Sequence, residues 1–261
     1  QHLYRFLSYN AMPENRVYIY DFFFDNCTTR VRDIFTFLYG KELIYRLDVQ
    51  QASYRRIIAP YLESKPYVRL GINLMFGMPS DRSPPLRRRL FLPFQLMKAV
   101  EKAEIADRGT SGQEREFEIT SQIVYRQRRP DPVPPPVSPA AALWLFAALA
   151  ALLSIMERGS RLSMAGAVMS RLLDGLALAL PGVIGTAIVL LWSFSGYAMT
   201  TGNLNFMWAW PTHLIAAFIG AGLSQRHILL RLYHAAASAA GILFILAVPV
   251  LPQSIPAAAI P

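Results

Sequence analysis

Apolar residues are concentrated in the second half of this 261-residue chain, and charged residues in the first half. Only seven charged side chains lie beyond Val137, where four apolar stretches each approach the ~20 residues that cross a bilayer. The stretches are approximately 139–156, 174–194, 206–223 and 234–251. None has a charge at its centre. The pattern therefore predicts four transmembrane helices over 140–261, preceded by a water-soluble domain over 1–129.

The arginines of the second half lie in alternate loops between these stretches. Three lie in 157–173 and two in 224–233, whereas 195–205 and the tail after residue 251 contain neither Lys nor Arg. Cytoplasmic loops of membrane proteins carry an excess of Lys and Arg. We therefore expect both arginine-bearing loops in the cytoplasm, and residues 1–138 and the C-terminus on the opposite side of the membrane.

Periodicity in the first half predicts structural elements on both sides of Cys27. Residues 16–24 are β-branched and aromatic and alternate at their start, which favours a strand. Apolar residues recur with helical spacing over 28–38, and Gly40 is placed to end that helix. Other patterns indicate a loop-rich 71–81, a helix over 90–103 and a short strand over 117–126. Cys27 is thus expected where a strand ends and a helix begins.

Composition agrees with a membrane-anchored protein. Apolar residues make up 53% of the chain and charged residues 16%, which is below the quarter usual for soluble proteins. Six prolines in 130–139 favour an extended, semi-rigid linker between the two domains. The net charge of +9 is not accompanied by a zinc-finger, RNA-binding or basic-heptad pattern, which argues against nucleic acid. Basic clusters such as Arg87, Arg88 and Arg89 suit either solvent or anionic lipid head groups.

Cys27, the single cysteine, has the position of a nucleophile. The first turn of a helix offers unpaired N–H groups and the positive end of the helix dipole, and both stabilise a thiolate. The same groups can stabilise the oxyanion that forms when an acyl carbonyl is attacked. A lone cysteine can also be a small buried apolar side chain. Its polar neighbours, and its place on the side of the membrane where disulfides form, favour a chemical role.

Three blocks of the sequence resemble the Lnb-type bacterial lipoprotein N-acyltransferases, a family long known only as a domain of unknown function. The first block, 13–33, is PENRVYIYDFFFDNCTTRVRD and resembles the segment around the family's cysteine. The second, 71–100, contains GMPSD and FLPFQLM and is similar to the family's glycine-rich segment and following helix. The third, 203–215, is NLNFMWAWPTHLI and resembles an element of the membrane half. Together the blocks span most of the chain.

The resemblance implies a circularly permuted papain-like α+β thiol domain, followed by a helical membrane domain in the bacterial inner membrane. The thiol domain would face the periplasm. Cys27 would take a fatty acyl chain from a membrane phospholipid as a thioester and pass it to the α-amine of a diacylglyceryl-cysteine lipoprotein. No metal or other cofactor is implied. In this family the catalytic histidine precedes the cysteine, so we expect the base upstream of Gln1 and a thiol domain incomplete at its N-terminus.

Several polar residues near Cys27 are further candidates. Asn26 or Asp25 could orient the thiol loop or help to form an oxyanion pocket. Arg30 and Arg32 could bind a phosphate head group or form ion pairs with Asp33, and we favour the ion pairs.

A second group of candidates lies where the third apolar stretch enters the membrane on the outer side. Asn203, Asn205 and Trp208 could line a lipid site beside Cys27. A tryptophan at such a position is also an ordinary interfacial anchor.

Two other functions fit the same residues. A membrane-tethered cysteine peptidase or amidase of the cell envelope would use water as the acyl acceptor. A non-enzymatic membrane assembly protein would use Cys27 structurally. Four membrane spans favour a lipid substrate, because a cell-wall hydrolase needs only an anchor.

Overall fold

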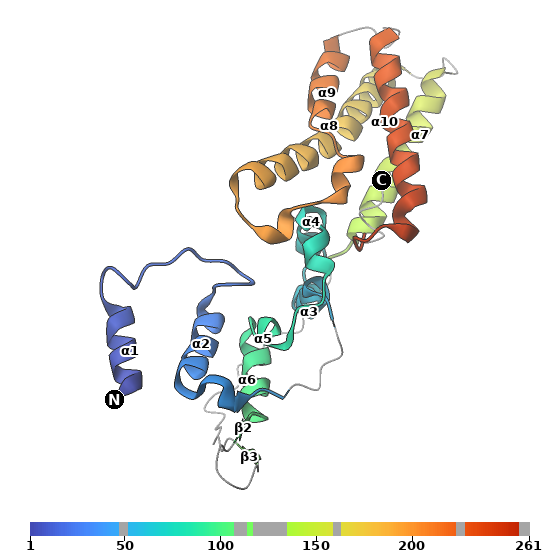
Figure 1. Cartoon of the computed structure of the whole chain (residues 1–261). Coiled ribbons are helices and arrows are strands. Elements are labelled where there is room, and N and C mark those ends of the chain that lie inside the picture. The colour runs from blue at the N-terminus through green and yellow to red at the C-terminus, as the bar shows by residue number, and fades with distance from the viewer. Residues whose placement is uncertain (47–51, 107–113, 117–134, 159–162, 223–227, 256–261) are drawn as a thin grey trace. The chain divides into compact units, whose positions relative to one another are not determined.

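The computed structural model describes residues 1–46, 52–106, 114–116, 135–158, 163–222 and 228–255 (Figure 1). The chain forms two compact units. The thiol unit comprises residues 1–57 and 83–130, and the helical unit comprises residues 58–82 and 131–261. The boundary differs from the one that we predicted at the proline-rich segment, because residues 58–82 group with the membrane helices.

The thiol unit is built from short helices and a small sheet. Its elements are α1 (His2–Ala11), α2 (Cys27–Tyr39), η1 (Gly40–Glu42), β1 (Leu43–Ile44), α3 (Tyr54–Ile58), α5 (Leu86–Arg89), α6 (Pro93–Glu101), β2 (Glu104–Ala106) and β3 (Glu114–Glu116). The three strands pair antiparallel in the order β1-β2-β3, with Ile105 opposite Leu43 on one side and Arg115 on the other. α6 therefore runs directly into the central strand.

Two predicted helices of the thiol unit are confirmed. α2 covers the predicted 28–38 and ends at Gly40, whose φ of 59° lies in the left-handed region that glycine adopts without strain. α6 covers most of the predicted 90–103. Leu90, Leu96, Ala99 and Val100 form a buried cluster, against which Phe35 of α2 packs. α2 and α6 are thus held together by apolar contact.

The predicted strand over 16–24 is not formed. Residues 17–20 have no assigned secondary structure, and 21–25 form a tight turn in which Asp21 and Asp25 make an isolated bridge. Residues that favour strands form one only where a neighbouring strand can pair with them, and no such strand lies beside 17–20 in the described residues. The predicted strand over 117–126 lies outside the described residues.

The helical unit contains the apolar half of the chain. Its longer helices are α4 (Pro66–Met75), α7 (Pro139–Arg158), α8 (Met164–Phe194), α9 (Thr212–Gly222) and α10 (Ile228–Ala247). Single turns are η2 (Ala59–Leu62), η3 (Met78–Asp81), η4 (Ala198–Thr200), η5 (Leu204–Met207) and η6 (Val248–Val250). The α8 segment and the segment Ile228–Val250 are long and apolar enough to cross a membrane, while Pro139–Leu153 of α7 and the whole of α9 are shorter apolar helices.

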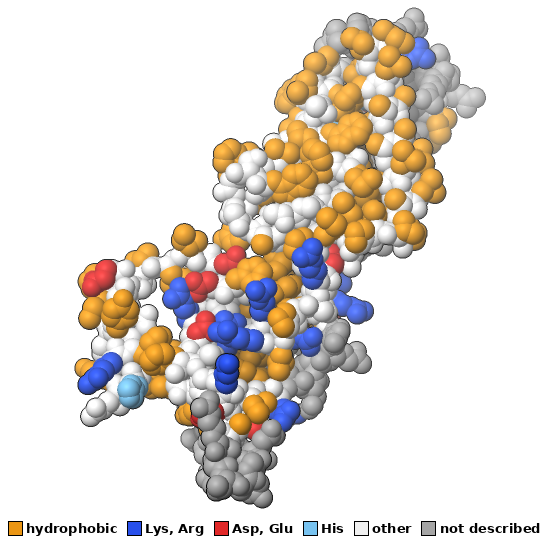
Figure 2. All heavy atoms as spheres, viewed as in Figure 1, with side chains coloured by type: hydrophobic (Ala, Val, Ile, Leu, Met, Phe, Trp, Pro, Cys, Tyr) orange, Lys and Arg blue, Asp and Glu red, His pale blue; other side chains and the backbone are white. Residues whose placement is uncertain are grey.

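Apolar side chains point outward from the helical unit. Figure 2 shows hydrophobic atoms spread over most of the visible face of the apolar helices, where few Lys or Arg side chains appear. Trp144, Phe218 and Leu246 are each more than two-thirds exposed. Lipid tails solvate such surfaces, whereas water does not, so this arrangement indicates a membrane domain.

α8 packs closely against the segment that leads into α9. A Cβ atom added at Gly185 would lie 2.1 Å from the carbonyl oxygen of Ala209, and one at Gly182 would lie 2.6 Å from the amide nitrogen of Leu214. Only glycine permits this close approach, and small residues are common where membrane helices pack against one another.

The segment 58–82 is attached to the helical unit by backbone hydrogen bonds. Gly77 N donates to Met199 O over 2.9 Å, and a Cβ at Gly77 would overlap Thr201 O. α4 contacts α7 and α8. The loop-rich structure that we predicted for 71–81 is therefore wrong in part, because its first half completes α4 and 78–81 form η3.

Candidate active site

Cys27 is the first residue of α2 and is exposed. Asn26 is the N-cap: its side-chain oxygen accepts from Thr29 N over 2.9 Å, and its own N–H donates to Thr29 Oγ1 over 2.8 Å. This reciprocal exchange is a capping box, which explains why the helix begins here. The N–H groups of Cys27 and Thr28 lie outside the exchange, at the positive end of the helix.

Asn26 also fixes the residues around the thiol. Its side-chain NH₂ donates to Phe22 O over 2.7 Å and to Phe91 O over 2.9 Å. The side chain is buried, and Phe91 stands just before α6. One amide group thus joins the start of α2, the preceding turn and the approach to α6. Whether these contacts orient the thiol for chemistry stays a prediction.

Aromatic side chains back this turn. Phe23 packs against Phe91 at 5.0 Å and against Tyr54 at 5.3 Å between ring centroids. Burial raises the pKa of the Tyr54 hydroxyl, so it remains an uncharged group in this cluster. The turn is closed by Asp21, whose carboxylate accepts from the N–H groups of Phe23 and Phe24. The turn before Cys27 is therefore held by both aromatic packing and hydrogen bonds.

Asp25 and Arg30 form a two-point ion pair, with Arg30 Nε and Nη2 at 2.5 and 2.6 Å from the carboxylate. The hydrogen bonds to Asp25 raise the pKa of Arg30. The guanidinium also lies 4.2 Å above the Tyr18 ring. Arg30 thus pairs with Asp25 and not with Asp33 as we favoured.

Arg32 follows the predicted pattern. Its Nη2 lies 2.9 Å from the Asp33 carboxylate, which also pairs with Arg87 from α5. Arg32 is buried and donates to Arg87 O as well. These contacts tie α5 to α2.

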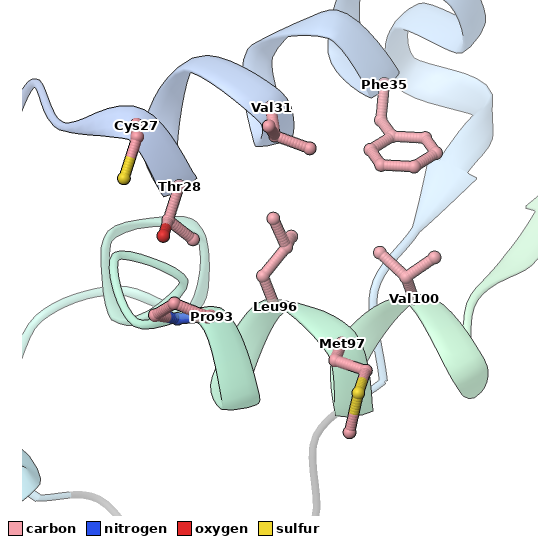
Figure 3. Close-up of a pocket in the computed structure, with 8 residues that line it drawn as sticks. All are labelled: Cys27, Thr28, Val31, Phe35, Pro93, Leu96, Met97 and Val100. Carbon is pink, nitrogen blue, oxygen red and sulfur yellow. The ribbon is translucent and has the colours of Figure 1, made fainter. Parts of the chain in front are cut away.

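An apolar groove of about 370 Å³ opens beside Cys27 (Figure 3). α2 and α6 form its two walls. The lining residues are Cys27, Thr28, Val31 and Phe35 from α2, and Pro93, Leu96, Met97 and Val100 from α6. None of them is charged. On α6 the spacing is i, i+3, i+4 and i+7, which places all four residues on one face of that helix.

The α6 wall was not among the predicted site residues. Its spacing over 93–100 predicted a helix, but the same pattern serves any buried helix face. That this face borders the thiol depends on the hydrogen bond between Asn26 and Phe91, which are 65 residues apart in sequence.

Asn203, Asn205 and Trp208 belong to the helical unit. The amide groups of both asparagines donate to Leu74 O, over 2.6 and 3.1 Å, and Trp208 Nε1 donates to Asn205 Oδ1 over 3.3 Å. Both asparagines are buried. Their polar atoms hold the end of α4, and their proposed place beside Cys27 stays a prediction.

The histidines occupy separate elements. His2 is exposed on α1, and His234 lies on α10. His213 is buried on α9 between Trp208 O, 2.9 Å from Nε2, and the Tyr233 hydroxyl, 2.7 Å from Nδ1. His227 lies outside the described residues. The contacts of His213 connect α9 to α10.

Comparison with known proteins identifies the second half of the chain. Residues 132–261 match a family model described as the Lnb transmembrane domain. No curated protein and no solved structure matches the chain. The match includes the third of the three sequence blocks and agrees with the apolar helices of the helical unit. The chain therefore belongs to the Lnb family, and residues 132–261 are its transmembrane domain.

Proposed function

We propose that this protein is a lipoprotein N-acyltransferase that carries a fatty acyl chain on Cys27. The observation that carries the proposal is an exposed thiol at a helix N-terminus, opening onto an uncharged groove in a membrane protein. A hydrocarbon chain fits such a groove, and a thiol is the nucleophile that would hold it. Membership of the Lnb family supports the same conclusion.

The first step would transfer the acyl group from a phospholipid to Cys27. The sulfur attacks the ester carbonyl carbon, a C–S bond forms and the ester C–O bond breaks. The thiol proton ends on the glycerol oxygen of the departing lysophospholipid. The N–H groups of Cys27 and Thr28 would stabilise the oxyanion, since the first N–H groups of a helix have no acceptor within it.

The second step would release the chain to an amine. The α-amine of a diacylglyceryl-cysteine attacks the thioester carbonyl, a C–N bond forms and the C–S bond breaks. The amine proton returns to the sulfur, so Cys27 is regenerated. Splitting the transfer in this way replaces one difficult displacement with two easier ones.

The proposal extends to fold and location. A permuted papain-like relationship fits a cysteine that begins a helix packed against a small antiparallel sheet unit. A position at the outer face of the bacterial inner membrane fits both substrates, which are a phospholipid and an exported lipoprotein.

The test is the acyl-enzyme itself. Full-length protein in phospholipid vesicles should gain the mass of one fatty acyl group, which hydroxylamine at neutral pH removes. Cys27→Ser should lose the adduct, because a hydroxyl is a much weaker nucleophile at neutral pH. Cys27→Ala should lose it as well, while its urea midpoint stays close to that of the wild type, because the exposed sulfur buries little apolar area.

The acceptor is tested separately with a diacylglyceryl peptide that has a free α-amine. The proposal predicts an N-acyl peptide, formed as the adduct disappears. Release of free fatty acid in its place would favour the hydrolase alternative. Unchanged acylation of the peptide by Cys27→Ala would show that the thiol is structural.

A further inference from the structure

We propose that the groove between α2 and α6 measures the acyl chain, and that Phe35 sets its maximum length. This inference rests on the proposed function, because the chain in question is the one attached to Cys27. It goes further by assigning a binding site and a residue that determines specificity.

The geometry gives the groove a direction. Cys27, Val31 and Phe35 are four residues apart on α2 and share one face, so the thiol and the ring are about 12 Å apart along the helix. Figure 3 shows Cys27 at one end and Phe35 at the other, with Leu96 reaching up from α6 between them. A chain that starts at the sulfur and follows the groove therefore runs toward Phe35.

The polarity of the lining changes along the same direction. Thr28 lies beside Cys27 and supplies the hydroxyl at that end, where the thioester carbonyl would sit. Beyond it the walls are hydrocarbon, apart from the Met97 thioether at the edge. An acyl group has this same sequence of a polar head and an apolar tail.

The charge of the surroundings favours an acyl chain over a peptide. The groove lining is uncharged, and the arginines of α2 and α5, such as Arg30 and Arg87, are not part of it but form ion pairs with Asp25 and Asp33. A peptide would bring backbone groups that need hydrogen-bond partners, and an apolar wall offers none. A hydrocarbon chain carries no such requirement, and the groove is continuous with the thiol that would hold it.

Core contacts hold Phe35 in place at the end of the groove. Its side chain packs against the buried cluster of Leu90, Leu96, Ala99 and Val100, and Val100 points toward it from α6. A ring held by core contacts does not move aside at little cost, because tightly packed interiors resist displacement. Chain atoms that reach Phe35 must therefore stop or turn out into solvent.

The experiment compares acyl-chain distributions on Cys27. Full-length protein is placed in vesicles that contain phosphatidylethanolamines with saturated chains from decanoyl to octadecanoyl in equal amounts. Intact mass then gives the share of each chain on the protein. Phe35→Ala should move the maximum to longer chains. Two more buried methylenes correspond to roughly a tenfold change in the ratio of long to short adducts.

The same helix offers a matched control. Phe37 is half exposed and stacks on Phe6 of α1, and it is not part of the groove. Phe37→Ala removes an identical ring two residues away and should leave the distribution unchanged. Val31→Phe fills the middle of the groove and should move the maximum to shorter chains.

The outcomes separate the two proposals. An unchanged distribution on Phe35→Ala with normal total adduct overturns the measuring role but leaves the acyl-enzyme intact. Absence of any adduct on the wild type, with every lipid, overturns the proposed function itself. If Phe35→Ala proves unfolded, Val31→Phe decides the matter, and an unchanged chain length on that variant also overturns the inference.

Discussion

Asn26 holds three backbone groups that belong to different parts of the thiol unit. It accepts from Thr29 N and donates to Phe22 O and Phe91 O, and it is almost completely buried. Its replacement would leave two carbonyls without a donor and the helix without a cap. The position of Cys27 therefore depends on an amide that takes no part in bond making.

Asn26→Ala should lower the stability of the thiol unit by about 2–5 kcal/mol, from loss of the cap and of two buried hydrogen bonds. Asn26→Asp keeps the cap acceptor but loses both donors, so it should also destabilise the unit. Pulse proteolysis of vesicle-embedded protein in urea measures the change. Asn15→Ala serves as the control, because Asn15 makes one exposed bond to Tyr9 O, and it should shift the midpoint little.

The cap formed by Asn26 could be predicted from the sequence, but its long-range hydrogen bond could not. An asparagine just before a helical pattern, with a threonine three residues later, predicts a cap from local spacing alone. The hydrogen bond to Phe91 could not be predicted, because its acceptor is a backbone carbonyl, and every residue type has one. Arg30 shows the same limit. Asp25 and Asp33 both lie near it on the chain, and the helix start determines which one it meets.

At the scale of elements, α2 was predictable and the 17–20 segment was not. The α2 pattern is local, since each apolar position and the terminal glycine act within one helix. A strand depends on a partner strand that can come from any part of a chain, so composition at 17–20 indicated a strand that the described residues do not complete. The groove was predictable only in part. The helices that form its two walls were predicted, but the packing of one helix against the other was not.

The close packing of α8 predicts that replacing Gly185 lowers the stability of the helical unit. Gly185→Ala would place a Cβ within 2.1 Å of Ala209 O and push α8 away from the entry to α9. Overpacking of this kind destabilises by about 1–3 kcal/mol, so thermal denaturation in detergent should occur at a lower temperature.

The matched control lies on the same helix. A Cβ at Gly175 meets nothing within 4 Å, so Gly175→Ala should be neutral or slightly stabilising. An unaltered denaturation temperature for Gly185→Ala would mean that α8 and the 209–214 segment do not approach closely in the membrane.

At the scale of the molecule, the unexpected feature is the place of residues 58–82. Their charged residues and their place before the proline-rich segment suggested the soluble half, yet they pack with the transmembrane domain. Gln253, near the end of the described chain, donates to Phe76 O and accepts from Leu204 N. A contact between residues 177 positions apart cannot be inferred from hydropathy, which describes each segment alone.

The same contacts bear on how the chain crosses the membrane. Tyr67 of α4 donates to Val137 O, just before α7, and Gln253, after α10, donates to Phe76 O, just after α4, and to Asn203 Oδ1. The start of α7 and the end of α10 therefore both lie beside α4, at the same end of the helical unit. α7 runs away from that end and α10 runs back to it. The end of α7 and the starts of α8 and α10 therefore lie at the other end, and the arginine-bearing loops of the sequence adjoin these helix ends. The positive-inside rule then predicts that Val137 and Gln253 lie outside the cytoplasm.

Cysteine labelling tests this orientation directly. In a Cys27→Ala background, Ser138→Cys and Ser254→Cys should react with a membrane-impermeant maleimide in intact spheroplasts, because both side chains are exposed and the arginine pattern predicts that their end lies outside the cytoplasm. Met164→Cys, at the exposed start of α8, should react only after the membrane is permeabilised. The reverse pattern would place the groove and its thiol in the cytoplasm. An exported lipoprotein could not reach them there, so the labelling result bears on the proposed acceptor as well as on the topology.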